Sequence, residues 1–215
     1  MTEAGRVDDR TRLVRRLERS GHCERNSTAR AMRAVPRHEF VPRDRRERAY
    51  ADRPLPIGEG QTISAPHMVS MMTDLLELES GERVLEVGTG CGYHAAVTAE
   101  VVGAPSVYSV EVSRQLADET GARLERLGYG EISIRVGDGA DGWPAHGPYD
   151  ACYLTCASSA IPPAIVEQVR PGGRVLAPIG GVSQELVLAT VGTHSIVDRS
   201  SHGAVRFVPM RRGTE

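Results

Sequence analysis

A glycine-rich turn between two apolar runs constrains this chain more than any other feature of its sequence. Residues Val84–Val87 are mostly apolar and β-branched, as in a short buried strand, and Tyr93–Val102 is an apolar run of helical length. Three glycines alternate with other residues between these runs, beginning at Gly88. Glycine lets the backbone turn tightly and approach a ligand, which the free N–H groups at the start of the next helix can bind. The stretch therefore predicts a nucleotide-type site at the end of a buried strand.

The spacing of the glycines and the next acidic residue narrow the choice of ligand. The spacing is G-x-G-x-G, whereas dinucleotide enzymes carry G-x-G-x-x-G, so an NAD-linked oxidoreductase fits poorly. Glu111 ends the next apolar run, Val107–Val110, about where a carboxylate that binds ribose is expected. The alternative is an ordinary strand–turn–helix unit in which Glu111 is a solvated strand end.

The composition is that of one globular α/β domain without a membrane or metal signature. The chain has 215 residues, of which 40% are hydrophobic and 25% are charged. No apolar run approaches the length that spans a bilayer, and residues 1–10 are too charged for a secretory leader. We therefore expect a cytoplasmic protein without a membrane partner. The four cysteines lack C-x-x-C pairs and matching histidines, which predicts reduced thiols and no metal site.

The basic residues of the chain, apart from its histidines, are all arginines, and they are unevenly distributed along the sequence. The chain has 26 Arg and no Lys, and residues 1–60 hold 15 of these Arg beside 10 acidic residues. A positive N-terminal region can attract nucleic acid or a substrate carboxylate. Because acidic residues are interleaved with the arginines throughout, solvated helix faces are the better interpretation, and we expect no nucleic-acid partner.

The periodicity of the sequence predicts alternating strands and helices. Residues 64–78 form an amphipathic helix, and we expect residues 36–66 before it to be an ordered loop packed over the active cleft. The other expected helices are 6–20, 26–35, 93–102, 113–127 and 162–170, and the expected strands are 84–87, 106–110, 132–136, 150–154, 174–179, 184–191 and 205–210. A polar stretch separates the last two strands, which we expect to pair antiparallel. The alternation implies an open, mostly parallel sheet with helices on both faces.

Acidic residues lie near the carboxyl ends of the first three strands, at the edge where such sheets bind ligands. These residues are Glu86, Glu111 and Asp138. A ribose offers two hydroxyl donors that suit Glu111, an adenine offers an amino donor that suits Asp138, and Gly139 can present its N–H to a ring nitrogen. With no Lys and no P-loop motif, a di- or triphosphate is disfavoured. A nucleoside with a cationic tail fits, and S-adenosylmethionine is such a ligand.

Several segments of the chain resemble the protein-L-isoaspartate (D-aspartate) O-methyltransferase family. They extend from about residue 30 to the end and are Val35–Pro42, Gly60–Met68, Val84–Tyr93, Gly137–Gly139, Gly142–Pro144, Pro148–Asp150 and Arg206–Pro209. The resemblance implies a Rossmann-like class I S-adenosylmethionine-dependent methyltransferase fold with a mostly parallel seven-stranded sheet. It also implies methyl transfer to the free carboxylate of L-isoaspartyl residues in damaged proteins and peptides, with D-aspartyl residues left open. The methyl ester collapses to a succinimide, which can reopen as normal aspartate.

The resemblance also assigns parts of the chain to tasks within one domain, residues 1–215. Residues 1–80 are the helical, substrate and lid region, 81–180 the cofactor-binding core, and 181–215 the C-terminal antiparallel strands. Ser64 is expected to be the catalytic residue that hydrogen-bonds the substrate carboxylate. The expected cofactor-binding residues are Gln61, Thr62, Ile63, Ser64, Glu86, Gly88, Gly90, Glu111, Asp138 and Gly139, and no metal is expected. We expect the enzyme to be a monomer.

Ser64 also has a purely structural interpretation. It precedes an amphipathic helix with Pro66 in the first turn, which is the setting of an N-cap serine. Both roles are compatible, because N–H groups at such a position attract anions. His67 is interpreted as a polar first-turn residue rather than a general base. His67 and His38 are the imidazoles expected near the cleft.

The expected reaction needs no general base. A free carboxylate has a pKa of about 4 and is already ionised at neutral pH, so the enzyme has to align the reactants and exclude water. Residues 54–63 are expected to act as a lid. The competing functions are a carboxyl methyltransferase for one dedicated peptide or small molecule, and a protein that binds S-adenosylmethionine or isoaspartyl chains without turnover.

Overall fold

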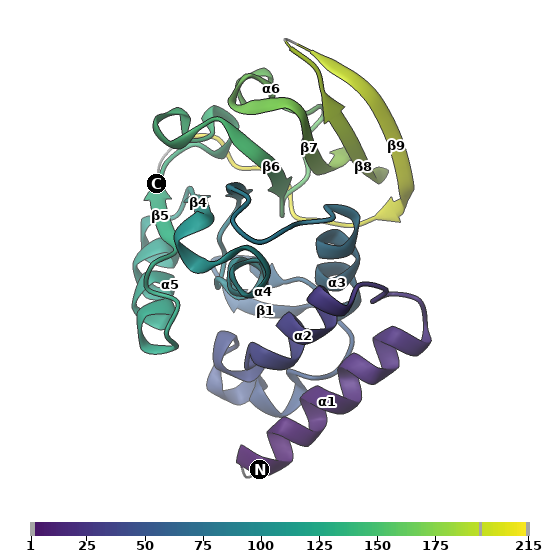
Figure 1. The fold of residues 1–215 in the computed structure, drawn as a ribbon. Coiled ribbons are helices and arrows are strands. Elements are labelled where there is room, and N and C mark those ends of the chain that lie inside the picture. Colours follow the sequence, from purple (N-terminus) through teal and green to yellow (C-terminus); the bar gives the residue numbers. More distant parts are fainter. Residues whose placement is uncertain (1–2, 194, 214–215) are drawn as a thin grey trace.

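A seven-stranded sheet forms the centre of the molecule (Figure 1). The computed structural model describes residues 3–193 and 195–213. The strand order is β5-β4-β3-β6-β7-β8-β9, and the pairs from β5 through to β7 are parallel, whereas β8 is antiparallel to both of its neighbours. The strands are β3 Val84–Val87, β4 Val107–Glu111, β5 Ser133–Val136, β6 Tyr149–Leu154, β7 Val169–Gly180, β8 Gln184–Val191 and β9 Ile196–Val205. The expected mostly parallel, seven-stranded sheet is confirmed.

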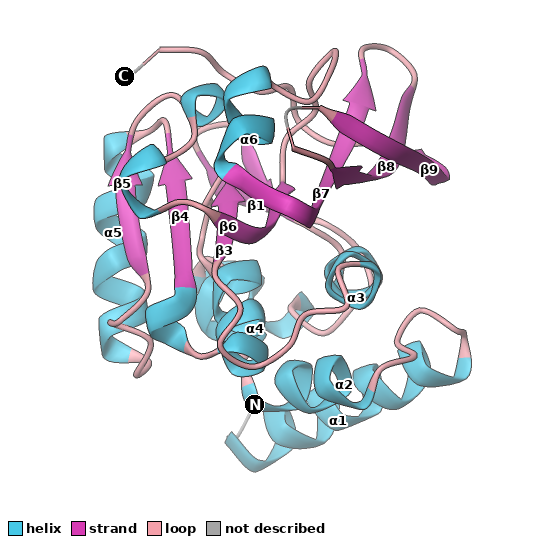
Figure 2. Ribbon diagram, turned by 45° about the horizontal axis from the view of Figure 1, so that its top comes forward, coloured by secondary structure: helices cyan, strands magenta, loops and turns pink. Residues whose placement is uncertain are grey.

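Alternate residues of the strands enter two separate cores, one on each face of the sheet. In β6, Ala151 and Tyr153 face the core that holds the N-terminal helices and α4, whereas Cys152 and Leu154 face the core that holds α6. The helices are α1 Glu3–Arg19, α2 Asn26–Ala34, α3 Pro66–Leu75, α4 Tyr93–Val102, α5 Arg114–Arg126 and α6 Pro163–Gln168. Figure 2 shows α4 and α5 beside the parallel strands. The expected coverage of both faces is confirmed.

The region expected to be one long loop, residues 36–66, has structure of its own. It contains two short 3₁₀ helices, Arg37–Phe40 and Arg43–Arg48, and an antiparallel hairpin of β1 (Leu55–Gly58) and β2 (Gln61–Ile63). The turn of the hairpin needs unusual backbone, because Glu59 has a φ of 50° and the flanking Gly58 and Gly60 also have positive φ. The expected order of this segment is confirmed, and the hairpin leads directly into the Ser64 segment.

The last predicted strand, residues 205–210, is wrong. The strand that completes the sheet is β9, which lies in the stretch that the sequence marks as a polar separator. As an edge strand, β9 leaves most of its residues exposed and therefore lacks the hydrophobic alternation that identifies strands in a sequence. The chain beyond it leaves the sheet and runs beside the loop after β6, where Ala157 exchanges backbone hydrogen bonds with Val208 and Met210, each with an N···O distance of 2.8 Å.

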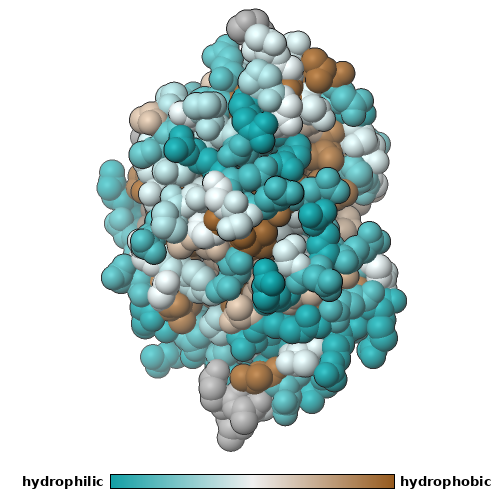
Figure 3. All heavy atoms as spheres, in the orientation of Figure 1, coloured by the Kyte–Doolittle hydropathy of each residue, from teal (hydrophilic) through white to brown (hydrophobic). Residues whose placement is uncertain are grey.

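The surface is largely hydrophilic, as Figure 3 shows for one face. Among the described residues, the exposed large hydrophobic side chains are those of Val7, Val182 and Val197. None of the helices in residues 3–193 and 195–213 is both long enough and apolar enough to cross a bilayer.

Candidate active site

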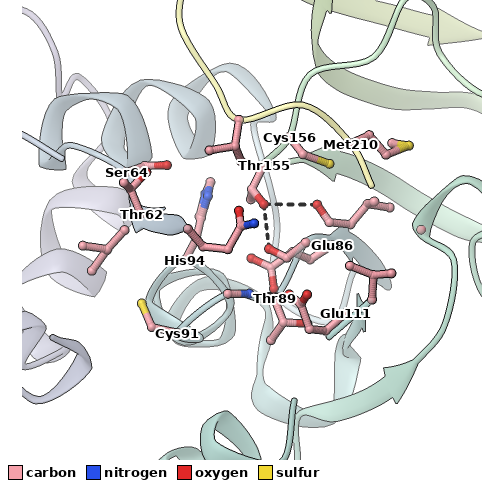
Figure 4. A pocket seen from close by; sticks show the side chains of 18 of the residues that line it. Thr62, Ser64, Glu86, Thr89, Cys91, His94, Glu111, Thr155, Cys156 and Met210 are labelled. Carbon is pink, nitrogen blue, oxygen red and sulfur yellow. Dashed lines mark hydrogen bonds between the residues drawn. The ribbon is translucent and has the colours of Figure 1, made fainter. Parts of the chain in front are cut away.

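One cavity lies at the carboxyl ends of β3, β4 and β6, and three other parts of the chain enclose it (Figure 4). The hairpin and the Ser64 segment line one side, and residues 208–211 of the C-terminal segment line another. Nine of the ten residues expected to bind the cofactor line this cavity, namely Gln61, Thr62, Ile63, Ser64, Glu86, Gly88, Gly90, Glu111 and Gly139. Asp138, the tenth, is not among the residues that line it.

The glycine turn is shaped by two close approaches. Gly88 has a φ of 94°, and a Cβ there would lie 2.4 Å from Oγ1 of Thr155, which donates a hydrogen bond to the Gly88 carbonyl. Gly92 is the N-cap of α4 with a φ of 83°, and a Cβ there would lie 2.7 Å from Thr120. Only glycine tolerates both the backbone conformation and the contact at these positions. Gly88 therefore presents bare backbone to the cavity, whereas Gly92 lets the start of α4 pack closely on α5.

Glu111 presents its carboxylate to the cavity from the end of β4. The side chain is 5% exposed, and its two oxygens accept hydrogen bonds from the N–H groups of Gly90 (2.8 Å) and Ser113 (3.1 Å). A carboxylate has about four acceptor positions, so each oxygen keeps one for a ligand. This geometry suits a diol such as that of ribose.

Glu86 is buried beneath the cavity in a polar network across three strands. Ser109 of β4 and Tyr153 of β6 are its neighbours in register, and their hydroxyls donate to its two oxygens at 2.6 Å and 2.9 Å. Thr89 is in turn hydrogen-bonded to Ser109, and Thr98 to Tyr153. Burial raises the pKa of Glu86 to about 8, although both hydroxyl donors act to lower it. Below that pH the acid can donate its proton to Ser109, whose hydroxyl then donates to Thr89.

Asp138 is engaged by the C-terminal segment. Its Oδ1 accepts from the N–H of Ala140 at 2.9 Å, and its Oδ2 accepts from Nε of Arg212 and the N–H of Gly213, both at 3.0 Å. Partial burial acts to raise the pKa of Asp138. The backbone N–H groups of Gly213 and Ala140 and the charge of Arg212 outweigh this effect and leave the pKa below its usual value. Oδ1 keeps one acceptor position, so a role toward adenine stays a prediction. Gly139, by contrast, lines the cavity, and a Cβ there would lie 2.4 Å from Cγ1 of Val87.

Ser64 is not the N-cap of the helix that follows it. The N-cap of α3 is Ala65, and no side chain caps the helix. The Ser64 carbonyl accepts a hydrogen bond of 2.7 Å from Arg37, whose guanidinium carbon lies 4.7 Å from the centre of the Tyr93 ring. Because the Ser64 hydroxyl does not cap α3, and because Ser64 lines the cavity, this hydroxyl is available to a ligand.

The histidines are distributed differently from expectation. His67 lies outside the cavity lining, where its ring Nδ1 and its backbone N–H both bond the Asp52 carboxylate at 2.9 Å. His38 is buried against Tyr50, with Nδ1 2.7 Å from the hydroxyl oxygen. The expectation that these two were the imidazoles near the cleft is wrong, because His94 lines the cavity.

Other lining residues were not among the site residues expected from the sequence. They are Val69, Val87, Thr89, Cys91, Tyr93, His94, Val110, Val112, Thr155, Cys156 and Val208–Arg211. The rule that ligands bind beyond the strand ends points to Thr155 and Cys156, since they follow β6 directly. For the C-terminal segment, the resemblance of Arg206–Pro209 to the family is the signal that the sequence carries. Within the described parts of the chain, no group of three His, Cys, Asp or Glu side chains is placed to hold a metal ion.

Comparisons with known proteins point to one family. Residues 8–215 match the family described as "Protein-L-isoaspartate(D-aspartate) O-methyltransferase (PCMT)". Among curated relatives, protein-L-isoaspartate O-methyltransferase 2 of Archaeoglobus fulgidus is 47% identical over 205 residues, covering 95% of this chain and 93% of its own length. Protein-L-isoaspartate O-methyltransferase of Methanopyrus kandleri is 48% identical over 204 residues, covering 94% and 90%.

Solved structures agree with this relationship. A protein-L-isoaspartate O-methyltransferase of 31% identity superimposes with a TM-score of 0.84 over 93% of this chain, which spans 65% of that longer chain. A putative protein-L-isoaspartate O-methyltransferase of Plasmodium falciparum, solved in complex with S-adenosyl-L-homocysteine, shares the fold with a TM-score of 0.83 at 23% identity, covering 95% and 99%.

The raised pKa of Glu86 predicts how the stability of the ligand-free protein depends on pH. The folded protein keeps a proton on Glu86 up to about pH 8, whereas the unfolded chain loses it near 4.5. The contribution of Glu86 to the free energy of unfolding should therefore be fully present below pH 4.5 and be lost as the pH rises toward 8, by about 1.4 kcal/mol per pH unit within that window.

Glu86→Gln should remove this contribution, because its amide stays neutral and can still bond Ser109 and Tyr153. The free energy of unfolding, measured by chemical denaturation at pH 5.5 and 7.5, should fall more for the unmodified protein than for the variant. Equal falls in both proteins would contradict the assignment of a raised pKa to Glu86.

Proposed function

Since the chain belongs to the protein-L-isoaspartate (D-aspartate) O-methyltransferase family, we propose that this cavity transfers a methyl group from S-adenosylmethionine to isoaspartyl carboxylates of damaged proteins. The observation that carries the proposal is the meeting of the Ser64 segment and Glu111 in one cavity. In this proposal residues 1–80 are the helical, substrate and lid region, residues 81–180 the cofactor-binding core, and residues 181–215 the C-terminal antiparallel strands.

The residues of the cavity fit the cofactor chemically. Glu111 keeps acceptor positions for the ribose hydroxyls, and the apolar side chains of Val87, Val110 and Val112 suit the faces of an adenine ring. Glu111 brings a carboxylate to the lining, which suits a ligand that carries positive charge, whereas Glu86 holds a proton near neutral pH and adds a neutral polar group. S-adenosylmethionine supplies an electrophilic methyl group on a positively charged sulfur.

The chain's own residues have to position the acceptor rather than activate it. A carboxylate with a pKa of about 4 is ionised at neutral pH and is already a nucleophile. Ser64 donates a hydrogen bond to it, while Arg37 keeps the Ser64 backbone in place. The hairpin and residues 208–211 exclude water, which favours a reaction that joins a negative carboxylate to a cationic donor and forms neutral products.

Two finer points belong to the proposal. The four cysteines form no disulfide, and three of them are buried, which supports a reducing, cytoplasmic setting. We place D-aspartyl residues among the substrates on the family relationship alone, and the monomeric state and the absence of nucleic-acid or membrane partners stay predictions.

The decisive experiment offers the enzyme an isoaspartyl peptide and its normal aspartyl twin. Labelled S-adenosylmethionine should methylate the isoaspartyl peptide and leave the twin unmodified, because the free carboxylate of an isoaspartyl residue is attached directly to the main chain, whereas that of the twin is one CH2 group farther away. A panel of peptides with varied flanking residues separates a repair enzyme, which accepts most of them, from an enzyme for one dedicated peptide. Binding without single-turnover transfer would favour the non-catalytic alternative.

Ser64→Ala tests the acceptor side. Loss of the hydroxyl should lower kcat by more than about tenfold while cofactor affinity stays within a few-fold. Since Ala65 is the N-cap, the melting temperature should be almost unchanged, whereas loss of a capping serine costs about 1 kcal/mol. A variant that loses stability but keeps its turnover would show that Ser64 has only a structural role.

Glu111→Ala tests the cofactor side. It removes hydrogen bonds to ribose that are worth about 1.5–3 kcal/mol each, so the affinity for S-adenosylmethionine in calorimetry should fall at least tenfold. Ser113→Ala is the matched control, because it disturbs the same turn through the cap of α5 but leaves the ribose acceptor. Equal losses in both variants would assign the effect to the turn instead.

The pH profile tests the absence of a general base. With the substrate carboxylate as nucleophile, kcat/KM on an isoaspartyl peptide should be flat from pH 5.5 to 7.5, without an inflection near 6.5. His94 adds none, because burial lowers its pKa to about 3. The profile should be the same for His67→Gln. An inflection that disappears in this variant would show that His67 does proton chemistry.

A further inference from the structure

His94 is a polar residue of the cavity to which the proposed reaction gives no task. It lies in the first turn of α4, two residues after the Gly92 cap, and is 7% exposed. Its ring packs on Tyr153 with 4.3 Å between ring centres. The sequence alone would make it a buried helix residue, yet it belongs to the cavity lining.

A hydrogen-bond chain determines which nitrogen of His94 carries the proton. Thr73 has one hydroxyl hydrogen, and it donates this hydrogen to the carbonyl of Val69 at 2.8 Å. Toward Nε2 of His94, at 3.2 Å, the Thr73 oxygen can therefore only accept. The proton of the ring is on Nε2, and Nδ1 is a bare acceptor. Burial lowers the pKa of His94 to about 3, so the ring stays neutral.

The Nδ1 atom has access to the cavity. None of the described residues hydrogen-bonds it, yet it is not among the fully buried polar atoms without a partner. An unpartnered acceptor that is not sealed off, on a residue that lines the cavity, is available to a ligand. In Figure 4 the His94 ring lies between Ser64 and Thr62 on one side and Glu86 on the other.

The position of His94 selects the part of the cofactor that it meets. Glu111 and Ser64 both line the cavity, and the proposed reaction places the ribose at Glu111 and directs the transferred methyl group toward the acceptor at Ser64. The sulfur of the cofactor carries three branches, so when the ribose faces Glu111 and the methyl group faces Ser64, the amino-acid portion is left for the remaining lining, which includes His94. The ammonium group of that portion is a strong N–H donor. We propose that Nδ1 of His94 accepts a hydrogen bond from the α-ammonium group of S-adenosylmethionine, which makes His94 a cofactor-binding residue. This rests on the cofactor half of the proposed function and not on the acceptor.

Two ligands separate this contact from a general packing effect. S-adenosylhomocysteine retains the ammonium group, whereas 5′-methylthioadenosine lacks the amino-acid portion. In calorimetry, His94→Leu should weaken S-adenosylhomocysteine about tenfold and change 5′-methylthioadenosine by less than about twofold. His94→Asn places an amide oxygen near the position of Nδ1 and should retain most of the affinity. His146→Leu, which removes a ring stacked on Tyr108 outside the cavity, should affect neither ligand.

Nitrogen NMR of the unmodified protein gives a second measurement that needs no variant to fold. In the free protein, the chemical shift of His94 Nδ1 should be that of an unprotonated nitrogen. It should change when S-adenosylhomocysteine is added and should remain unchanged when 5′-methylthioadenosine is added. A protonated Nδ1, or equal losses of both ligands in His94→Leu, would overturn the proposal. If S-adenosylhomocysteine binds as expected but no isoaspartyl peptide is methylated, the proposed acceptor fails and the His94 contact stands.

Discussion

Parallel pairing of β3 between β4 and β6 is the constraint on which the site depends. Val87 is in register with Val110 on one side and Leu154 on the other, so the three strands end at the same level. The ladder continues past the strands, since Gly88 donates to the Val110 carbonyl and Thr155 to that of Val87. In a parallel sheet this alignment brings residues far apart in sequence to one edge, where the glycine turn, Glu111 and Thr155 enclose the cofactor cavity.

A buried arginine couples the acceptor side to this edge. Arg37 has no exposed surface, and it donates to the carbonyls of Ala49 and Ser64 while its guanidinium lies over Tyr93. Burial lowers the pKa of Arg37, an indication of how unfavourable a charge is there, although the nearby Tyr93 acts in the opposite direction. Since Tyr93 begins α4 directly after the glycine turn, one side chain links the Ser64 segment, the preceding loop and the cofactor helix.

The polar groups of the cavity differ in charge according to their burial. Glu111 is held by two backbone N–H groups at the rim, whereas Glu86 below it holds a proton near neutral pH because burial raises its pKa to about 8. His94 stays neutral for the same reason and offers a lone pair. A cationic, nucleoside-like donor thus meets the Glu111 carboxylate and the neutral side chains of Glu86 and His94, while Arg211 also belongs to the lining.

The sequence by itself determined the features that depend on local pattern. Each of these features can be recognised within a single turn, strand or helix. They are the glycine spacing, the run Val84–Val87, the helix Tyr93–Val102 and Glu111 at the end of its strand. The edge strand β9 was missed, since an exposed edge carries no hydrophobic alternation. Tertiary structure alone decided that the C-terminal segment binds Asp138, that Ala65 rather than Ser64 caps α3, and that Thr73 fixes the His94 proton. Each of these depends on the exact position of atoms that the fold brings together, for which the sequence has no periodic signal.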